Sequence, residues 1–569
     1  MSKLSLRQIL IFMATGLAGI GWLVPNHYAP WVSAWSDGAS IVAFFLMAFL
    51  MLAEVKQREH GKQSALLVFV ACVSVAAIFF QVIFGKIIYS GDAVVSAFYV
   101  FIWFGATIVG AVAKGKFGEE WLLVFLVGLA GISALSVTIA LLQWTGSHEL
   151  GVYFAELKPG GRPFANVAQP NHFGTICFVG LCTMLYIYER KLIGRLPILL
   201  LASFFVIGMV LSQSRTGLLQ LVMLSIFSWM KKGRWPILFS RALLLFLCVS
   251  AFVGVSKLRE INELLLLGGG RYFQDSIGQE IRFPYWSSMV DALRREPLWG
   301  YGWQQIGAAQ YAIALDHPSV GAHFEHSHNL ILDLMLWNGV FLGGALVLAL
   351  IIWGAGVFSR LKDASELWIF AIIAGLFVHS MSEYPLDYAY FLIPLGLLMG
   401  WLQGSNKFEI EVKSKKSLCC ILILTFPAFL AIAFDYARFE EAFRTLRLET
   451  AGIGAEATMI SIPNAVVLNQ LESFQKFAAK EARPKMTVNE LNAMKMAALR
   501  FGYPPVLFRY AIALGLNGKG SDAQVVISRI CKIHGKKSCQ EAAENWGGLA
   551  KKYPELLNAK FNTENVIER

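Results

Sequence analysis

The chain has 569 residues, of which 56% are hydrophobic and 15% are charged. Soluble globular proteins carry roughly 25% charged residues, and the mean hydropathy is +0.56, so composition excludes a soluble protein. The formal net charge of +11 would suit a nucleic-acid partner, but the positive residues follow a membrane topology, so no nucleic acid is expected.

Apolar segments recur along the first 435 residues. A helix needs roughly 20 apolar residues to cross a lipid bilayer. Thirteen transmembrane helices are predicted, near residues 6–24, 38–54, 65–84, 93–113, 121–143, 171–188, 196–212, 217–230, 236–255, 329–357, 367–381, 388–403 and 417–434. The predicted fold class is therefore all-α, a polytopic membrane protein.

Lysine and arginine are unevenly distributed between the two sets of loops. The N-terminus and the loops 55–64, 114–120, 189–195, 231–241, 358–366 and 403–416 carry 20 of them, whereas the loops 25–37, 85–92, 145–170, 213–216 and 382–387 carry 4. Positive residues stay on the cytoplasmic side. The N-terminus is therefore predicted to be cytoplasmic and the C-terminus periplasmic.

Four domains follow from this topology. They are the N-terminal transmembrane helices 1–255, a large periplasmic loop 256–328, the C-terminal transmembrane helices 329–434 and a periplasmic helical domain 435–569. In the last of these, apolar residues recur at helical spacing. Helices are predicted from Pro504 and from Ser521 to His534, a pair that resembles a tetratricopeptide hairpin.

Two of the eight cysteines, Cys531 and Cys539, lie in the tail, and the other six lie in apolar spans. An oxidising compartment permits disulfides. Cys531 and Cys539 are therefore a candidate disulfide, with two unrelated thiols as the alternative.

Four of the ten histidines lie within twelve residues, from His317 to His328, at the end of the long loop. Imidazole can accept a proton near neutral pH. His328, at the head of an apolar helix, is the candidate base, and Glu325 or His326 could orient it. A metal site is the rival interpretation, but the spacing fits neither a helical zinc motif nor a finger. The third alternative is a set of solvated loop histidines.

Arginine is scarce on the predicted periplasmic side, where Arg162, Arg215 and Arg282 lie beside polar residues. A single arginine at a membrane surface can simply extend its guanidinium into lipid headgroups. Three of them favour an anionic ligand, because guanidinium binds phosphate oxygens with two hydrogen bonds. A lipid diphosphate is the anion presented at that depth.

The residues around His328 resemble the outer-loop motif of the O-antigen ligase and polymerase-like superfamily. His328-Asn329 is followed after nine residues by Gly339, although Leu342 stands where that pattern has Gly, Thr or Tyr. Arg282 and Trp286, with the segment 297–302 downstream, resemble the long loop of the same superfamily.

Two further segments are similar to the PglL-type protein O-oligosaccharyltransferases. These are Asn26-His-Tyr-Ala-Pro-Trp31 and the segment 161–174, which contains Gln169-Pro170-Asn171. Proline suits the first turn of a helix, so the second segment is also a predicted helix start. A helical soluble tail is typical of these enzymes as well.

This resemblance implies a glycosyltransferase that moves a glycan from undecaprenyl diphosphate to Ser or Thr of an exported protein, often a type IV pilin. It implies an essential histidine at His328, with no cofactor and no metal expected. The implied substrate-binding residues are Arg162, Gln169, Asn171, Arg215, Arg282, Trp286, Glu383 and Tyr384, and Asp387 is a further candidate. Glu383 has an alternative role as a loop residue paired with an arginine.

Two other functions stay open. An O-antigen ligase would transfer polysaccharide to lipid A-core. A lipid-glycan flippase would place charges at the bilayer midplane and show inverted repeats, whereas the predicted spans are nearly free of charge at their centres.

Overall fold

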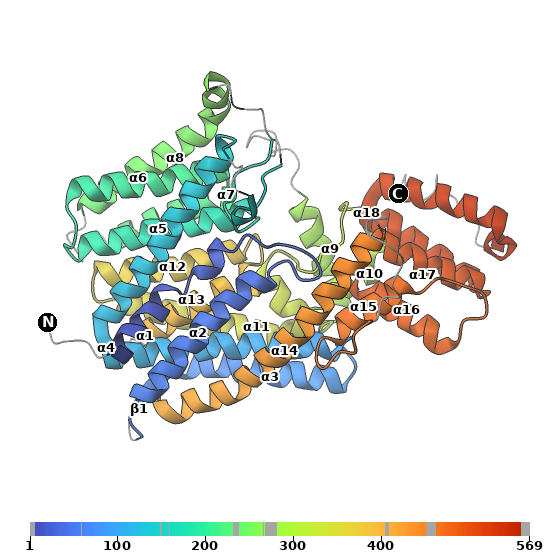
Figure 1. Ribbon diagram of the computed structural model, residues 1–569, viewed down its shortest axis with the longest axis horizontal. Coiled ribbons are helices and arrows are strands. Elements are labelled where there is room, and N and C mark those ends of the chain that lie inside the picture. The colour runs from blue at the N-terminus through green and yellow to red at the C-terminus, as the bar shows by residue number, and fades with distance from the viewer. Residues whose placement is uncertain are drawn as a thin grey trace. The chain divides into compact units, whose positions relative to one another are not determined.

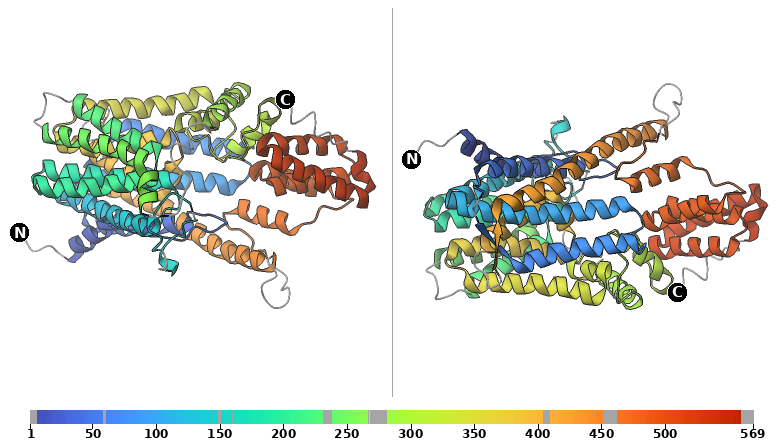
Figure 2. Two further views of the ribbon diagram at one scale, coloured as in Figure 1. Left: turned by 90° about the horizontal axis from the view of Figure 1, so that it is seen from above. Right: turned by 90° about the horizontal axis from the view of Figure 1, so that it is seen from below.

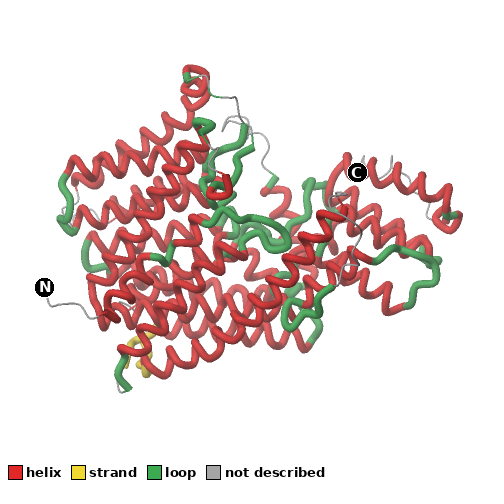
Figure 3. The backbone as a smooth tube through the Cα atoms, in the orientation of Figure 1, coloured by secondary structure: helices red, strands yellow, loops and turns green. Residues whose placement is uncertain are grey.

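The computed structural model describes residues 6–57, 60–147, 151–158, 160–230, 238–265, 267, 281–403, 409–450 and 462–558, which are mostly helical (Figure 3). Parts of three predicted segments lie outside the described residues. They are 236–237 at the start of a span, 266 and 268–280 in the large loop, and 451–461 and 559–569 in the tail.

Most of the predicted membrane spans coincide with α-helices (Figure 1). The first, 6–24, does not: α1 (Leu6–Gly16) ends at Gly16 and is followed by turns and a 3-10 helix, η1 (Ile20–Leu23). The helices are α1 (Leu6–Gly16), α2 (Ala34–Glu54), α3 (Ala65–Ile83), α4 (Ser90–Trp144), α5 (Pro170–Glu189), α6 (Arg195–Ser212), α7 (Arg215–Met230), α8 (Leu238–Leu264), α11 (Leu330–Arg360), α12 (Ala364–Ser380), α13 (Ala389–Leu402) and α14 (Ser414–Thr450). Among the described residues, eight helices are long and apolar enough to cross a membrane. The chain is therefore a polytopic membrane protein.

Helix α4 contains two of the predicted spans and is interrupted at Gly118, which has φ +57°. Near its beginning, Tyr99 donates to a carboxylate at the start of α2. Near its end, Gln143 donates to a carbonyl in the loop before α5. Between them, Lys114 donates to a carbonyl at the end of α13, 2.8 Å away. Both ends of α4 thus contact loops poor in lysine and arginine, 25–37 and 145–170. Its middle contacts the end of α13, next to the basic loop 403–416, so the chain reverses direction at Gly118.

The chain forms two compact units. The first comprises Met1–Cys72, Tyr99–Glu280 and Leu348–Pro427, and the second comprises Val73–Phe98, Ile281–Val347 and Ala428–Arg569. Within the first unit, α5 packs against α6, α7 and α12 (Figure 2).

Loops on one side of the first unit are connected by hydrogen bonds. The loops 25–37, 145–170, 213–216 and 382–387 are joined by His27 Nε2 to the Asn166 carbonyl (2.6 Å), Arg162 Nη1 to the Gln213 carbonyl (3.3 Å) and Thr216 Oγ1 to Ser382 Oγ (3.0 Å). These are the short loops of the first unit that are poor in lysine and arginine. Their grouping agrees with the alternation of loops derived from charge.

The basic loops of the first unit form the second set. The contacts are Arg7 to Glu54 (3.3 Å), Glu119 to Arg190 (3.7 Å), and the Ser240 hydroxyl to Glu189. These contacts connect the basic loops of the first unit to one another.

A two-stranded antiparallel ribbon is the one departure from the all-α prediction among the described residues. It pairs β1 (His60–Ser64) with β2 (Glu409–Lys413), in register Lys62 with Glu411 and Ser64 with Glu409. Lys62 Nζ lies 3.0 Å from Glu409 Oε2. Cross-strand pairs of opposite charge stabilise such a ribbon, which is why these charged loops are extended rather than irregular.

The second unit contains α9 (Arg282–Arg295), α10 (Ile306–Ile313), η4 (Ala314–Asp316) and the tail helices α15 (Asn469–Ala479), α16 (Val488–Arg500), α17 (Pro504–Leu516) and α18 (Gly520–Lys552). The predicted helix start at Pro504 is confirmed. The predicted helix ending at His534 is also found, but α18 continues beyond a non-helical Gly535. Thr487 and Glu490 form a capping box that begins α16. Helix α18 lies against α17 (Figure 2).

Helix α11 is interrupted at Gly339, which has φ +78° and ψ 169°. A Cβ at this position would lie 2.2 Å from the Leu298 carbonyl oxygen. The interruption lets the preceding segment pair with the helix, because Val340 N–H donates to the Pro297 carbonyl at 2.8 Å and Tyr301 N–H donates to the Leu336 carbonyl at 2.7 Å. Glycine is required here by both backbone conformation and space.

Candidate active site

His328 immediately precedes the cap of α11 and has a left-handed backbone, with φ +59°. Asn329 Oδ1 accepts the Leu332 N–H at 3.1 Å and caps the helix. On the other side of His328, the Ser327 N–H donates to Asp333 Oδ1 at 2.7 Å. The backbone is thus fixed on both sides of the histidine.

Helix α9 holds the same loop from a second direction. Trp286 Nε1 donates to the Ser327 carbonyl at 2.8 Å, and the Tyr285 hydroxyl donates to the His326 carbonyl at 3.3 Å. Burial raises the pKa of Tyr285 well above its ordinary value, so the phenol keeps the proton that it donates. Arg282 stands four residues before Trp286, on the same face of α9. Arg282 therefore stands one helical turn from the tryptophan that holds the His328 loop.

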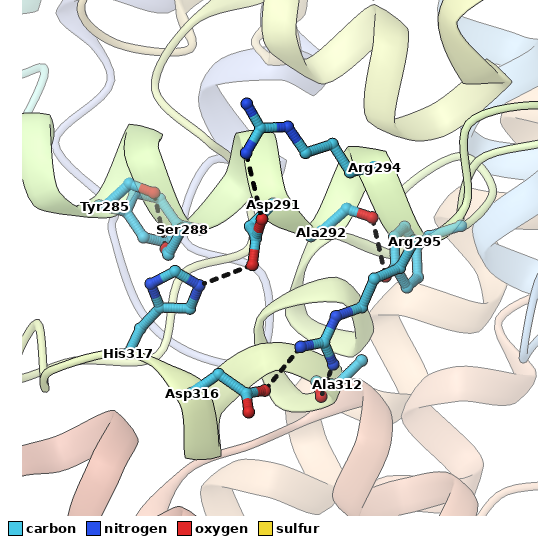
Figure 4. A network of polar contacts seen from close by, with 10 residues as sticks. Tyr285, Ser288, Asp291, Ala292, Arg294, Arg295, Ala312, Asp316 and His317 are labelled. Atoms are coloured by element: carbon cyan, nitrogen blue, oxygen red, sulfur yellow. Dashed lines mark hydrogen bonds and ion pairs between the residues drawn. The ribbon is translucent and has the colours of Figure 1, made fainter.

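A polar network fixes α9 to the segment after α10 (Figure 4). Asp291 Oδ2 lies 3.3 Å from His317 Nε2, and its other oxygen lies 3.4 Å from Arg294 Nη1. Arg295 Nη2 lies 2.7 Å from Asp316 Oδ2. His317 therefore pairs with α9.

The two other acidic and basic candidates of the histidine loop have different partners. His326 is buried, and its Nδ1 lies 3.7 Å from Asp333 Oδ2. The Glu325 carboxylate lies 3.5 Å from Arg500 Nη1 and accepts the Tyr503 hydroxyl at 3.2 Å. His326 thus lies within the His328 turn, while Glu325 connects that turn to the tail.

In the first unit, Gln169 and Asn171 flank the start of α5. Gln169 Oε1 accepts the His172 N–H at 2.9 Å, so the predicted helix start at Pro170 is confirmed. Asn171 Nδ2 donates to Glu383 Oε1 at 3.0 Å, and Asn171 Oδ1 accepts the Ser214 hydroxyl at 2.8 Å. Asn171 thereby joins three loops that are far apart in the sequence.

The remaining candidates of the first unit lie in these same loops. Arg215 is the first residue of α7, and Arg162 donates to the carbonyl of Gln213 two residues before it. The Tyr384 ring stacks on Tyr388, with ring centroids 5.9 Å apart. Arg162 thus binds the backbone of the turn that leads into Arg215.

Left-handed backbone is concentrated in these segments. Of the seven non-glycine residues with positive φ among those described, Ala165, Ala168, Gln213 and His328 lie in the candidate site loops. Such conformations cost free energy and tend to occur at functional sites.

Sequence reasoning missed a buried polar layer at the start of α5. His172 Nδ1 lies 2.9 Å from the Tyr390 hydroxyl, and the Thr175 hydroxyl lies 2.9 Å from His379 Nδ1. The two imidazole rings are 5.3 Å apart. The signal was present, because ionisable residues inside apolar spans usually serve a function.

Within the part of the chain that the structure describes, no group of three or more His, Cys, Asp or Glu side chains is arranged to hold a metal ion. The rival metal interpretation needed His323, Glu325, His326 and His328 to converge. His323 packs instead edge-on against Tyr503, with ring centroids 5.4 Å apart.

In the tail, Cys531 and Cys539 form a disulfide. It spans Gly535, where the helix is interrupted.

Comparison with known proteins matches the regions that carry these loops. The family described as O-antigen ligase matches residues 198–349, and the family described as virulence factor membrane-bound polymerase, C-terminal, matches residues 367–546. These define an integral-membrane glycosyltransferase.

Two relatives from Acinetobacter baylyi refine the class. A general O-oligosaccharyltransferase is 27% identical over 550 residues, which are 93% of each chain. A ComP-specific O-oligosaccharyltransferase is 28% identical over 338 residues, 58% of this chain and 60% of that one. The chain is similar to the O-antigen ligase family over residues 198–349, and its enzyme class is that of the protein O-oligosaccharyltransferases.

Proposed function

We propose that the protein transfers a glycan from undecaprenyl diphosphate to Ser or Thr hydroxyls of an exported protein at the periplasmic face. The observation that carries this proposal is the left-handed His328 turn, held by Trp286 and Asp333, with Arg282 one helical turn before Trp286 on α9. The 93% alignment with a general O-oligosaccharyltransferase supports the reaction class.

In the proposed reaction, His328 accepts the proton of the acceptor hydroxyl as that oxygen attacks the first sugar. A carbon–oxygen bond forms to the acceptor, and the bond between the sugar and the diphosphate breaks. Undecaprenyl diphosphate leaves with the bonding electron pair. Arg282, Arg162 and Arg215 stabilise the charge that develops on its oxygens, and Gln169, Asn171, Trp286, Glu383 and Tyr384 contribute to binding.

The proposed topology has thirteen crossings, a cytoplasmic N-terminus and a periplasmic tail in the bacterial inner membrane. The grouping of the loops supports it, because the loops poor in lysine and arginine contact one another and the basic loops contact one another. The excess of positive charge on the second set assigns that set to the cytoplasm.

The proposed acceptor is a type IV pilin. One relative is named for a single acceptor, ComP, which supports a protein substrate rather than a lipid. The alternative, ligation of O-antigen to lipid A-core, is supported by the O-antigen ligase family match at residues 198–349.

Intact-mass measurement of pilin from wild-type and deletion strains tests the proposal. A glycan mass present in the wild type and absent in the deletion is the expected result. Loss of long lipopolysaccharide in the deletion strain, with an unchanged pilin mass, would establish the ligase alternative instead.

A further inference from the structure

The tail helices and the segment before the histidine loop share one hydrophobic core. Ala314 of η4 is buried in the core that α16, α17 and α18 form, and Tyr311 of α10 packs against it. The Arg529 guanidinium lies 4.1 Å over the Tyr311 ring. Within the second unit, the tail is therefore built onto the chain that leads to His328.

Arg500, the last residue of α16, makes the polar connection. Its Nε lies 2.9 Å from Asp92 Oδ2 and its Nη2 lies 3.3 Å from Asp92 Oδ1. Its Nη1 lies 3.5 Å from Glu325 Oε1, which also accepts the Tyr503 hydroxyl at 3.2 Å. The side chains of Arg500 and Asp92 are only 12% and 3% exposed. One guanidinium thus binds the start of α4 and the histidine loop at once.

The charges in this cluster depend on one another. Burial lowers the pKa of Arg500, but the negative charges of Asp92 and then Glu325 together raise it by more than burial lowers it, so the net shift of the pKa is upward. For Glu325, burial raises the pKa, and Arg500 foremost, followed by His323 and His326, lowers it below its ordinary value. Arg500 and Asp92 are buried, whereas the Glu325 side chain is 37% exposed. Removing one member of a buried ion pair leaves an uncompensated charge, which is strongly destabilising. Arg500 therefore keeps Glu325 ionised and in place.

His323 provides an independent contact between the loop and the tail. Its ring fills a narrow slot: a Cβ at Gly502 would lie 2.7 Å from His323 Nδ1, and a Cβ at Gly307 would lie 2.4 Å from its Cε1. His534 Nε2 lies 2.8 Å from the Gly502 carbonyl and supports that wall of the slot. The loop is thus fixed to the tail by packing as well as by charge.

We propose that Arg500 is a positioning residue for glycan transfer: it holds Glu325, and through it the three-residue segment that ends at His328. The proposal rests on the role proposed above for His328. A segment of three residues spans at most roughly 10 Å, so a displacement of Glu325 is carried to the base. A displacement of about 1 Å can cost roughly 100-fold in rate.

The test measures transfer by the full-length enzyme in liposomes, with a lipid-linked glycan donor and an acceptor protein. We expect Arg500→Gln to lower kcat by about 100-fold, with little change in the KM for the donor. Arg509→Gln is the matched control, because Arg509 is a partly buried arginine of the adjacent helix whose contacts lie within the tail: the carbonyls of Phe477, Ala478 and Lys480 and the ring of Phe477. An equal fall in kcat for both variants would overturn the proposal.

The pH profile separates positioning from a general loss of structure. The charged or titratable groups facing Glu325 are Arg500, His323, His326, Tyr503 and Asp92. Without the Arg500 guanidinium, burial raises the pKa of Glu325, so the acid limb of kcat should move to higher pH. The acid limb of Arg509→Gln should stay at its wild-type position. An unmoved limb in Arg500→Gln contradicts the proposal.

Two further variants cover the case in which Arg500→Gln does not fold. Arg500→Lys keeps the charge but loses the two-point contact, and we expect an intermediate kcat with a wild-type acid limb. Glu325→Gln removes the charge on the loop side alone and should also lower kcat, whereas a wild-type kcat would refute the coupling. Where Arg500→Gln does fold, adding Glu325→Gln to it should lower kcat no further, and additive losses would again refute the coupling. His328→Asn is the reference variant. Wild-type activity in His328→Asn would exclude His328 as the base and so reject the proposed function. If His328→Asn is inactive but Arg500→Gln and Arg509→Gln have equal kcat values, only the positioning role of Arg500 is rejected.

Discussion

The side-chain amide of Asn171 donates to Glu383 Oε1 at 3.0 Å, across 212 positions of sequence. The carbonyl of the same amide accepts the Ser214 hydroxyl. We expect Asn171→Asp to lower transfer about tenfold or more, because it removes the hydrogen bond and places a second carboxylate beside Glu383. Initial rates with lipid-linked donor measure this.

A compensating change at Glu383 serves as the control. Glu383→Gln supplies an amide that can donate to the new aspartate, so the Asn171→Asp, Glu383→Gln pair should recover part of the lost rate. A double variant that is slower than both single variants would show that the negative charge of Glu383, rather than the connection between loops, is what the reaction requires.

Substitution of His328 should stop the chemistry without unfolding the loop. Asn is the informative replacement, because it tolerates left-handed backbone better than alanine and has no basic nitrogen. General-base catalysis contributes roughly 10²- to 10⁴-fold, so His328→Asn should lose at least about 100-fold in kcat while lipid-linked glycan persists in the membrane. Wild-type pilin glycosylation in this variant would exclude His328 as the base.

Gly339 should tolerate no side chain. A Cβ there would lie 2.2 Å from the Leu298 carbonyl oxygen at a φ of +78°, so Gly339→Ala should destabilise the protein by about 3 kcal/mol or more. Gly344 of the same helix has nothing within 4 Å of an added Cβ, so Gly344→Ala is the control. Thermal unfolding of the detergent-solubilised protein distinguishes them, and equal unfolding temperatures would contradict the close approach.

The free energy of unfolding should decrease as the pH is lowered, because His323 is buried. Burial foremost lowers its pKa from 6.5 to about 4, while Glu325 opposes the shift and Arg500 and His534 add to it. Below pH 6.5 the unfolded chain binds a proton that the folded chain excludes, so stability is lost progressively down to about pH 4. Between pH 7 and pH 5 the loss is about 2 kcal/mol.

His323→Asn removes the titrating group and should flatten that pH dependence. The measurement is the difference between unfolding temperatures at pH 7 and pH 5 in the wild type and the variant. Identical differences would show that other groups govern the acid limb of stability.

The disulfide makes two predictions about the tail. A peptide linking Cys531 to Cys539 should be recovered from alkylated, unreduced protein, as expected of a tail in an oxidising compartment. Replacing both by serine should cost the tail about 2–3 kcal/mol through loop-closure entropy. Serine at Cys72 and Cys420, both exposed, is the control and should leave the unfolding temperature unchanged. Free thiols at 531 and 539 in exported protein would contradict the assignment.

The membrane helices could be predicted from the sequence because their length is set by the bilayer. The starts of α5 and α17 were also predictable, since proline marks the first turn locally. The ribbon was not, because β1 acquires its conformation from β2 near the other end of the membrane region. Strand preference depends on such partners more than on the residues themselves.

The site was predicted one loop at a time, and its connections were not. Nothing near Asn171 in the sequence indicates Glu383, and nothing near Glu325 indicates that the partner in the tail is Arg500 rather than Arg509. Whether the arginine of α16 or that of α17 reaches Glu325 depends only on how the two helices pack in the folded protein. The residues with chemical groups were therefore foreseeable, and the residues that hold them were not.

The β1–β2 ribbon imposes an order on biosynthesis. Residues 60–64 leave the ribosome long before residues 409–413, so the early strand stays unpaired while most of the membrane helices are inserted. The two strands can meet only if both have been left on the same side of the bilayer. A single helix that fails to insert between them would separate the strands, so closure of the ribbon distinguishes a correctly inserted chain from one that has missed a crossing.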